Sequence, residues 1–121
     1  MTPAPMGVSC LCGTVAQRVS PRRTDSGMKE IAISHGDTDR HTTGILCASY
    51  YPTQEPHLSG SPSEHHGADG YTRYFCRNCG CHVFRRKAAG NQAEWEVATG
   101  VLIDKSRHPL LDHPHIWTTQ K

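Results

Sequence analysis

The chain has 121 residues and a formal net charge of +2 when its nine histidines are counted as neutral. This length fits a single domain, and so small a charge argues against a protein that binds nucleic acid. No apolar run approaches the ~20 residues that a membrane-spanning helix needs. Hydrophobic residues make up only 36% of the chain, so we expect many short strands or a stabilising metal ion.

The N-terminal half predicts short strands between polar loops. Residues 1–7 have the composition of a loose leader, and they lack the basic start and long apolar stretch of a secretory signal. Residues 8–19 predict a strand, a tight turn and a second strand, and the alternation in 29–34 predicts another. Residues 35–44 are polar and predict a loop or a short helical turn, and 45–51 are again strand-like.

The C-terminal half continues this pattern. Residues 52–70 contain three Pro and three Gly and predict a mobile loop. Residues 71–84 predict an aromatic strand, a second tight turn and a further strand, and 95–102 and 115–119 predict two more. We therefore expect one all-β domain of short strands, starting at residue 8 and reaching residue 121.

Two cysteine motifs give the clearest chemical signal, Cys10-Leu11-Cys12-Gly13 and Cys76-Arg77-Asn78-Cys79-Gly80. A tetrahedral zinc needs four ligands at about 2.3 Å, and two tight turns that meet can supply two thiolates each. The glycine that ends each motif allows a sharp turn, so that amide N–H groups point at the thiolates. The alternatives are four buried thiols or two disulfides. We predict one structural zinc ion, held by Cys10, Cys12, Cys76 and Cys79.

The other notable side chains have ordinary interpretations. Without secretory features, we expect a cytoplasmic location in which cysteines are metal ligands or thiols. Cys47 and Cys81 are interpreted as small buried hydrophobic residues, and His82 as a strand histidine with its hydrogen bonds satisfied. The basic run 85–87 predicts a solvated strand end or turn, and His65-His66 predict a surface loop or a lid over a pocket.

On its cysteine motifs the chain resembles the glutathione-dependent formaldehyde-activating enzyme family, which includes the centromere protein V group. The first matching segment is Ser9-Cys10-Leu11-Cys12-Gly13-Thr14-Val15, and the central one is Arg73-Tyr74-Phe75-Cys76-Arg77-Asn78-Cys79-Gly80. Weaker similarities lie at 99–102 and 115–117, so the resemblance covers residues 8–119. It implies an Mss4-like β-tent of packed antiparallel sheets, the same four cysteines as structural zinc ligands, and carbon–sulfur lyase activity on glutathione adducts.

The resemblance breaks at the segment that would hold a second, catalytic zinc. Family members usually carry three cysteines there, in a Cys-His-Cys-x-x-Cys-Arg motif. The matching positions in this chain are Ser34, Gly36 and Asp39. Glycine has no ligand atom and serine is a poor zinc ligand, so the three-thiolate site is not expected to form.

Five ionisable side chains remain in this segment, within a stretch of seven residues. A histidine oriented by a carboxylate could do acid/base work, with an arginine holding an anionic oxygen. Histidine and aspartate could instead form a metal site of altered type, or the segment could be a solvated loop without a role. We select as candidate catalytic residues His35, Asp37, Asp39, Arg40 and His41.

Three functions follow from these interpretations. The first is an enzyme that acts on a small organic molecule by acid/base chemistry, of the lyase, isomerase or cyclase type, in a specialised biosynthetic pathway. The second is a binding or scaffolding pseudoenzyme. The third is a carbon–sulfur lyase on glutathione adducts with an altered second metal site. The expected partner is a small-molecule substrate, with no nucleic acid and no membrane, and a homodimer is left open.

Overall fold

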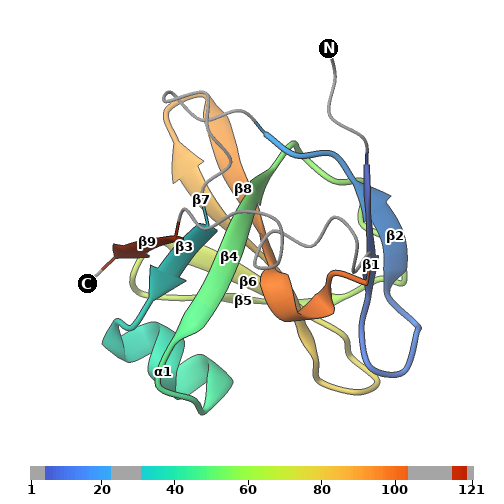
Figure 1. Cartoon of the computed structure of the whole chain (residues 1–121), viewed down its shortest axis with the longest axis horizontal. Coiled ribbons are helices and arrows are strands. Elements are labelled where there is room, and N and C mark those ends of the chain that lie inside the picture. Colours follow the sequence, from blue (N-terminus) through green and yellow to red (C-terminus); the bar gives the residue numbers. More distant parts are fainter. Residues whose placement is uncertain (1–4, 23–30, 104–115, 120–121) are drawn as a thin grey trace.

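The computed structural model describes residues 5–22, 31–103 and 116–119. These ranges form two sheets and one short helix (Figure 1), which confirms the all-β prediction. The small sheet pairs β1 (Met6–Ser9) with β2 (Ala16–Val19) in antiparallel fashion. The large sheet has seven strands in the order β5-β6-β7-β8-β4-β3-β9. Its neighbours are antiparallel except β3 and β9, which are parallel.

The remaining elements follow the predicted order along the chain. The strands of the large sheet are β3 (Ile31–Ser34), β4 (Ala48–Thr53), β5 (Ser63–His66), β6 (Tyr71–Phe75), β7 (His82–Ala89), β8 (Gln92–Ala98) and β9 (Ile116–Thr119). The helix is α1 (Asp37–Thr43), and a 3-10 turn, η1 (Thr99–Val101), follows β8. In the described ranges, no helix is long and apolar enough to cross a membrane.

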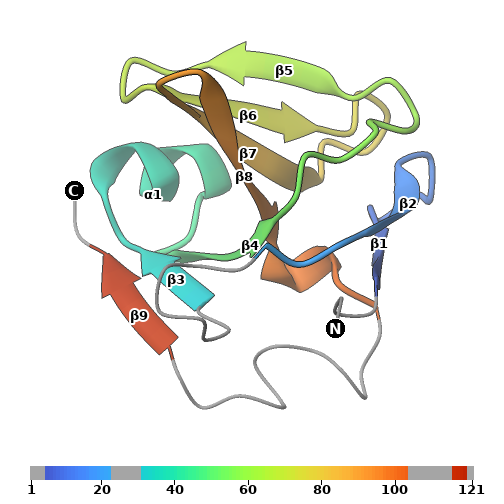
Figure 2. The ribbon, with the colours of Figure 1, turned by 90° about the horizontal axis from the view of Figure 1, so that it is seen from above.

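The large sheet is strongly curved. Figure 2 shows β5, β6 and β7 on one side and β3 and β9 on the other, with α1 between them. The small sheet lies beyond the other end of β4, and two isolated bridges connect it to the rest: Val8 with Leu102, and Pro21 with Thr53. The curvature therefore places α1 on the inner face of the sheet, against side chains of β4, β6 and β7.

One hydrophobic cluster connects the two sheets. Tyr74 stacks on Trp95 with 5.2 Å between ring centroids, and Phe84 meets the same indole edge-on. Each buried side chain of this kind contributes about 1.5–3 kcal/mol to the free energy of unfolding. The cluster includes side chains from both sheets and from the turn after β8: Met6, Val8, Val15, Val19, Ile31, Tyr51, Tyr74, Val83, Phe84, Trp95, Val97, Val101 and Leu102.

Several boundaries differ from the sequence prediction. β1 begins at Met6, inside the segment predicted as a loose leader. β4 begins at Ala48 rather than at residue 45, so Cys47 precedes the strand and is exposed, and its predicted burial was wrong. Residues 37–43 form a helix although they have no apolar face, and the helix ends at Gly44, whose φ of 75° lies in the left-handed region.

The segment 52–70 is more regular than its composition predicted. Its first two residues belong to β4, and 63–66 form the edge strand β5. Between them, Ser59 donates its backbone N–H to the Gln17 side chain at 3.1 Å, and Gln17 donates to the His57 carbonyl at 2.9 Å. Gly60 has a φ of +77°, and a Cβ atom there would lie 2.3 Å from the Thr14 carbonyl oxygen. This part of the segment therefore lies against β2, whereas its mobility and its role as a lid stay predictions.

Candidate functional site

The two cysteine motifs form tight turns of the predicted kind. In the first, Gly13 donates its N–H to the Cys10 carbonyl at 3.2 Å and has a φ of 83°. In the second, Gly80 donates to the Cys76 carbonyl at 2.8 Å and has a φ of 76°. Both glycines thus adopt a conformation that other residues reach only with strain. The first turn follows β1 and the second follows β6, so the two motifs come from different sheets.

The four motif sulfurs lie within 4.8 Å of one another. The Cys12 sulfur is 3.7 Å from the Cys10 sulfur and 3.7 Å from the Cys76 sulfur. A tetrahedron of sulfurs about 2.3 Å from a central zinc has edges of about 3.8 Å. The observed spacing is therefore that of ligands around one ion. These four cysteines could hold a metal ion, and a closed set of four thiolates is the arrangement of a structural site.

The surrounding amides favour thiolates at this cluster. The Val15 N–H donates to the Cys10 sulfur at 3.3 Å, and the Asn78 N–H donates to the Cys76 sulfur at 3.4 Å. Hydrogen bonds with Thr14 and with the Asn78 side chain lower the pKa of the Cys12 thiol to about 5. The pKa of Cys79 is lowered as well, whereas that of Cys76 is raised by burial and by the neighbouring cysteines. Metal binding requires deprotonated thiols, so the proton cost of forming the site is reduced at Cys12 and Cys79.

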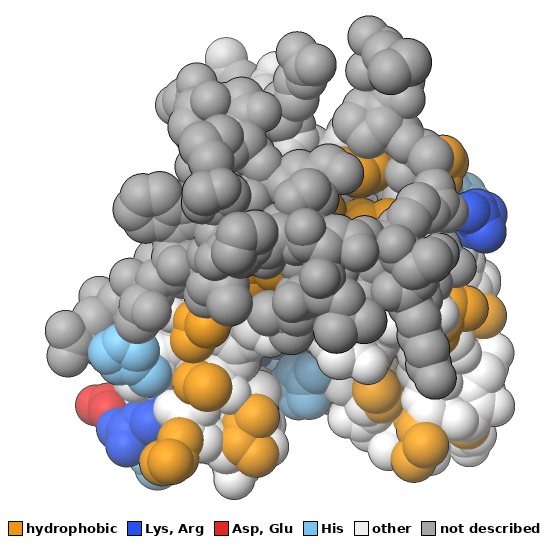
Figure 3. Space-filling model, viewed as in Figure 1, with side chains coloured by type: hydrophobic (Ala, Val, Ile, Leu, Met, Phe, Trp, Pro, Cys, Tyr) orange, Lys and Arg blue, Asp and Glu red, His pale blue; other side chains and the backbone are white. Residues whose placement is uncertain are grey.

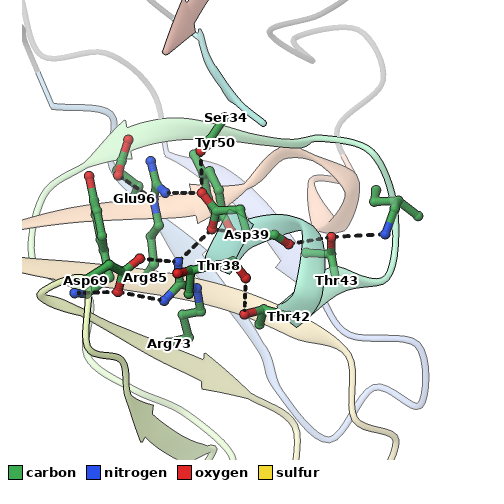
Figure 4. A network of polar contacts seen from close by, with 12 residues as sticks. Ser34, Thr38, Asp39, Thr42, Thr43, Tyr50, Asp69, Arg73, Arg85 and Glu96 are labelled. Atoms are coloured by element: carbon green, nitrogen blue, oxygen red, sulfur yellow. Dashed lines mark hydrogen bonds and ion pairs between the residues drawn. The ribbon is translucent and has the colours of Figure 1, made fainter. Parts of the chain in front are cut away.

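The carboxylate of Asp39 is the centre of a buried ion network on the inner face of the large sheet (Figure 4). The residue is only 3% exposed. It accepts hydrogen bonds from Arg73 Nη2 at 2.7 Å and from Arg85 Nη1 at 3.1 Å, and a further one from the Ser34 hydroxyl. Tyr50 donates a longer bond at 3.5 Å. Both carboxylate oxygens are therefore occupied by donors, two of which are guanidinium groups.

Electrostatics keep Asp39 ionised despite its burial. Burial alone would raise its pKa, but the hydrogen bonds from Ser34 and Arg73 and the charge of Arg85 outweigh that effect and lower the pKa. Each arginine also has a second acidic partner. Arg73 pairs with Asp69 at 2.8 Å, and Arg85 pairs with Glu96 at 2.7 Å. The network thus contains three carboxylates and two guanidinium groups, with its central members buried.

The burial of Arg85 contradicts one sequence prediction. The run 85–87 was expected to be a solvated strand end or turn, but it lies within β7, and Arg85 is 2% exposed. Its guanidinium carbon lies 3.8 Å from the centroid of the Tyr50 ring. Only Lys87 of this run is fully on the surface. Alternation along the strand turns Arg85 toward Asp39 on the inner face.

The other four candidate catalytic residues do not join this network. Asp37 pairs with Arg40 one helical turn away, on the exposed side of α1. His41 is exposed and lies with Asp37 at a shallow surface depression, and His35 is half-buried directly after β3. In the described part of the chain, the carboxylates of Asp37 and Asp39 contact arginines rather than histidines. The predicted histidine–carboxylate pairing is thus not formed, and the catalytic roles of these residues stay predictions.

A pocket of about 500 Å³ lies at the C-terminal end of the 34–44 segment. It is lined by Thr43 and Ile45, by the start of β4 and by the η1 turn. Cys81 and His82, at the start of β7, complete the wall. Figure 3 shows a notch at the lower edge of the molecule, with hydrophobic side chains on both sides and a histidine at its back.

His82 is the ionisable base of this pocket. It is half-buried, and its ring lies against Phe75 with 5.9 Å between centroids. Burial, together with the charge of Arg73, lowers the pKa of His82 below its ordinary value. The environment of His82 therefore favours the neutral imidazole. Tyr50 also lines the pocket, and burial raises its pKa to about 12, so it remains a protonated hydrogen-bond donor.

Sequence reasoning missed His82 and the partners of Asp39. The only sequence signal for Arg73 was its place on an aromatic strand, where an alternating pattern turns every second residue inward. Tyr50, Arg85 and Glu96 had no such signal, because they meet only through the pairing of β4, β7 and β8.

The comparisons with known proteins agree with these motifs. No curated protein matches the chain. The family model described as "glutathione-dependent formaldehyde-activating enzyme" matches residues 5–120, which is nearly the whole sequence. The match spans both cysteine turns, the Asp39 network and the pocket. The chain therefore belongs to the glutathione-dependent formaldehyde-activating enzyme family.

Proposed function

We propose that this protein is an enzyme of the family that acts on a small organic molecule in the pocket lined by His82. The proposed chemistry is proton transfer at a carbon next to a carbonyl or a similar group, as lyases, isomerases and cyclases use. The observation that carries the proposal is the half-buried His82 imidazole in the wall of a pocket of about 500 Å³, where burial lowers its pKa. A general base must be unprotonated at the working pH and within reach of the substrate proton.

The pocket offers hydrogen-bonding groups next to this base. The hydroxyls of Ser49 and Thr99 are hydrogen-bonded to each other, and both residues line the pocket with Tyr50. Hydroxyl groups placed in this way can hold a substrate oxygen while negative charge develops on it. In this scheme His82 removes the proton from carbon and later returns it to the product, and no cofactor is required for the transfer.

The 34–44 segment supports the pocket rather than supplying the base. Thr43 donates its hydroxyl to the Asp39 carbonyl at 2.8 Å and also lines the pocket. The Asp39 carboxylate, bound by two arginines, fixes α1 on the sheet. A metal ion beside this carboxylate would be repelled by both guanidinium groups. This charge arrangement favours acid/base chemistry over a lyase mechanism that uses Asp39 in an altered second metal site.

We propose zinc as the metal at the four-cysteine cluster. Thiolate ligands with edges near 3.7 Å suit the bond length and geometry of zinc, and four protein ligands leave no open position for a substrate. The zinc would therefore stabilise the fold and take no part in the reaction. None of the six cysteines forms a disulfide in the structure, which fits the proposed cytoplasmic location.

The test compares two histidine variants, His82→Asn and His41→Asn. The assay is deuterium exchange at the α-carbon of small aldehydes and ketones, with phenylacetaldehyde as the first probe, followed by NMR in D₂O. We expect exchange above the buffer rate, a loss of about 10²-fold or more in His82→Asn, and no loss in His41→Asn. A loss of exchange in His41→Asn alone would indicate that the general base lies in the 34–44 segment. Exchange at the buffer rate with every probe would reject the proposed function.

A further inference from the structure

The lining of the pocket indicates the class of molecule that it accepts. Its walls include the apolar side chains of Ile45, Ala48, Ala98 and Val101. Its polar groups are hydroxyls, two thiols and the His82 imidazole, whose pKa is lowered by burial. Twelve described residues line the pocket, and none of them is Asp, Glu, Lys or Arg. The volume of about 500 Å³ lies within the range of small-molecule sites.

The nearest buried charges are already paired. Arg85 lies against the Tyr50 ring, and Tyr50 is part of the pocket wall. Its guanidinium bonds to Asp39 at 3.1 Å and to Glu96 at 2.7 Å, and it is 2% exposed. Tyr50 therefore separates the ion network from the pocket, and the guanidinium is not available as a counterion. A ligand carboxylate would lose its hydration there without gaining an opposite charge, which disfavours its binding.

The mouth of the pocket is apolar as well. Ile45 lines the pocket although 60% of its surface is exposed. An exposed apolar side chain at the entrance of a pocket gains free energy when an apolar ligand covers it. The entrance therefore favours the same kind of molecule as the walls.

We infer that the pocket selects a neutral, largely apolar molecule with one hydrogen-bonding oxygen, and that it discriminates against charged glutathione adducts. The inference rests on the proposed function for the identity of the site. A glutathione adduct carries two carboxylates and an ammonium group, whereas an uncharged aldehyde or ketone needs only the hydroxyls and apolar surface that line the pocket.

The test uses Cys47 as a reporter, because it is exposed and lines the pocket. The rate of its alkylation by N-ethylmaleimide is followed by peptide mass spectrometry on the full-length, zinc-loaded protein. The matched probes are 2-acetylnaphthalene and 2-naphthoate, which share a ring system and differ in charge, together with S-methylglutathione. We expect 2-acetylnaphthalene to protect Cys47 at a concentration at least tenfold below that of 2-naphthoate, and S-methylglutathione to give no protection.

Two variants check that protection reports this pocket. Ile45→Lys adds a cation at the entrance and should bring the two naphthyl probes to within about threefold of each other. Leu46→Lys, on the neighbouring residue that does not line the pocket, should leave the tenfold preference unchanged. Equal or better protection of the wild type by 2-naphthoate or S-methylglutathione would overturn the inference, as would protection by none of the probes. Selective protection without any proton exchange would reject the proposed reaction and leave the inference intact.

Discussion

Asp39→Asn is the substitution that tests the buried ion network most directly. The amide keeps nearly the shape of the carboxylate but removes its charge and turns one acceptor into a donor. Because Arg73 Nη2 and Arg85 Nη1 reach different oxygens of Asp39, at 2.7 Å and 3.1 Å, the amide nitrogen must face one guanidinium. Breaking a buried pair by removing one partner costs about 3–5 kcal/mol. Asp69 and Glu96 remain as partners of the two arginines, so we expect the free energy of unfolding to fall by about 3 kcal/mol.

The measurement is urea unfolding at pH 7, with Asp37→Asn as the matched control. Asp37 pairs with Arg40 on the surface, where 84% of its side chain is exposed, so this control should change the free energy of unfolding by less than ~1 kcal/mol. Equal losses for the two variants would refute the account of Asp39 as the centre of the network.

The same pair of variants predicts a pH dependence. The pKa of Asp39 is lowered in the folded state, so its contribution to stability is present above its unfolded pKa of about 3.9. That contribution is lost as the pH falls through the folded value. The stability difference between wild type and Asp39→Asn should therefore be constant from pH 7 to 5 and shrink below pH 4. A difference that shrinks between pH 7 and 5 instead would contradict the lowered pKa.

Two further predictions concern the small sheet and the cysteine cluster. Gly60→Ala should destabilise the fold by about 1–3 kcal/mol more than Gly70→Ala, as measured by thermal melting. Both residues have positive φ, but of the two only a Cβ at Gly60 would meet a backbone atom, the Thr14 carbonyl oxygen 2.3 Å away. Equal melting temperatures would show that the contact with Thr14 can relax. Cys76→Ser should lose both the bound metal and the cooperative melting transition. The control Cys47→Ser should keep one zinc per chain, as measured by elemental analysis. A folded, metal-free Cys76→Ser protein would refute a structural site.

The parts of the fold that the sequence predicted are those with local signals. Each cysteine motif carries its own turn glycine, so Gly13 and Gly80 could be assigned without knowing what lies beside them. Strands such as β3 and β6 show their alternation within a few residues. For the segment of α1 the sequence left a loop and a short helical turn open, because helices are recognised by an apolar face and this one turns Asp39 inward instead.

The candidate site could be predicted only in part, for the same reason. Asp39 was selected for its chemistry, but Arg73 and Arg85, its partners, are 34 and 46 residues away in sequence. Arginine is seldom buried, so nothing local distinguished Arg85 from a surface residue. The pocket needs the starts of β4 and β7 on either side of the end of β8, which depends on strand order. His82 could therefore be assigned a role only after the strands were placed.

The four-cysteine cluster has a consequence for how this domain responds to metal supply. Cys12 and Cys76 are separated by 64 residues, so a bound ion acts as a removable cross-link around a long loop. In the chain-entropy treatment, closing such a loop lowers the entropy of the unfolded chain by an amount worth about 4 kcal/mol. A two-stranded sheet such as β1–β2 is only marginally stable alone. We therefore expect metal starvation to loosen this sheet first. Its bridge from Val8 to Leu102 adjoins the pocket residue Val101, so the effect would next reach the proposed substrate pocket.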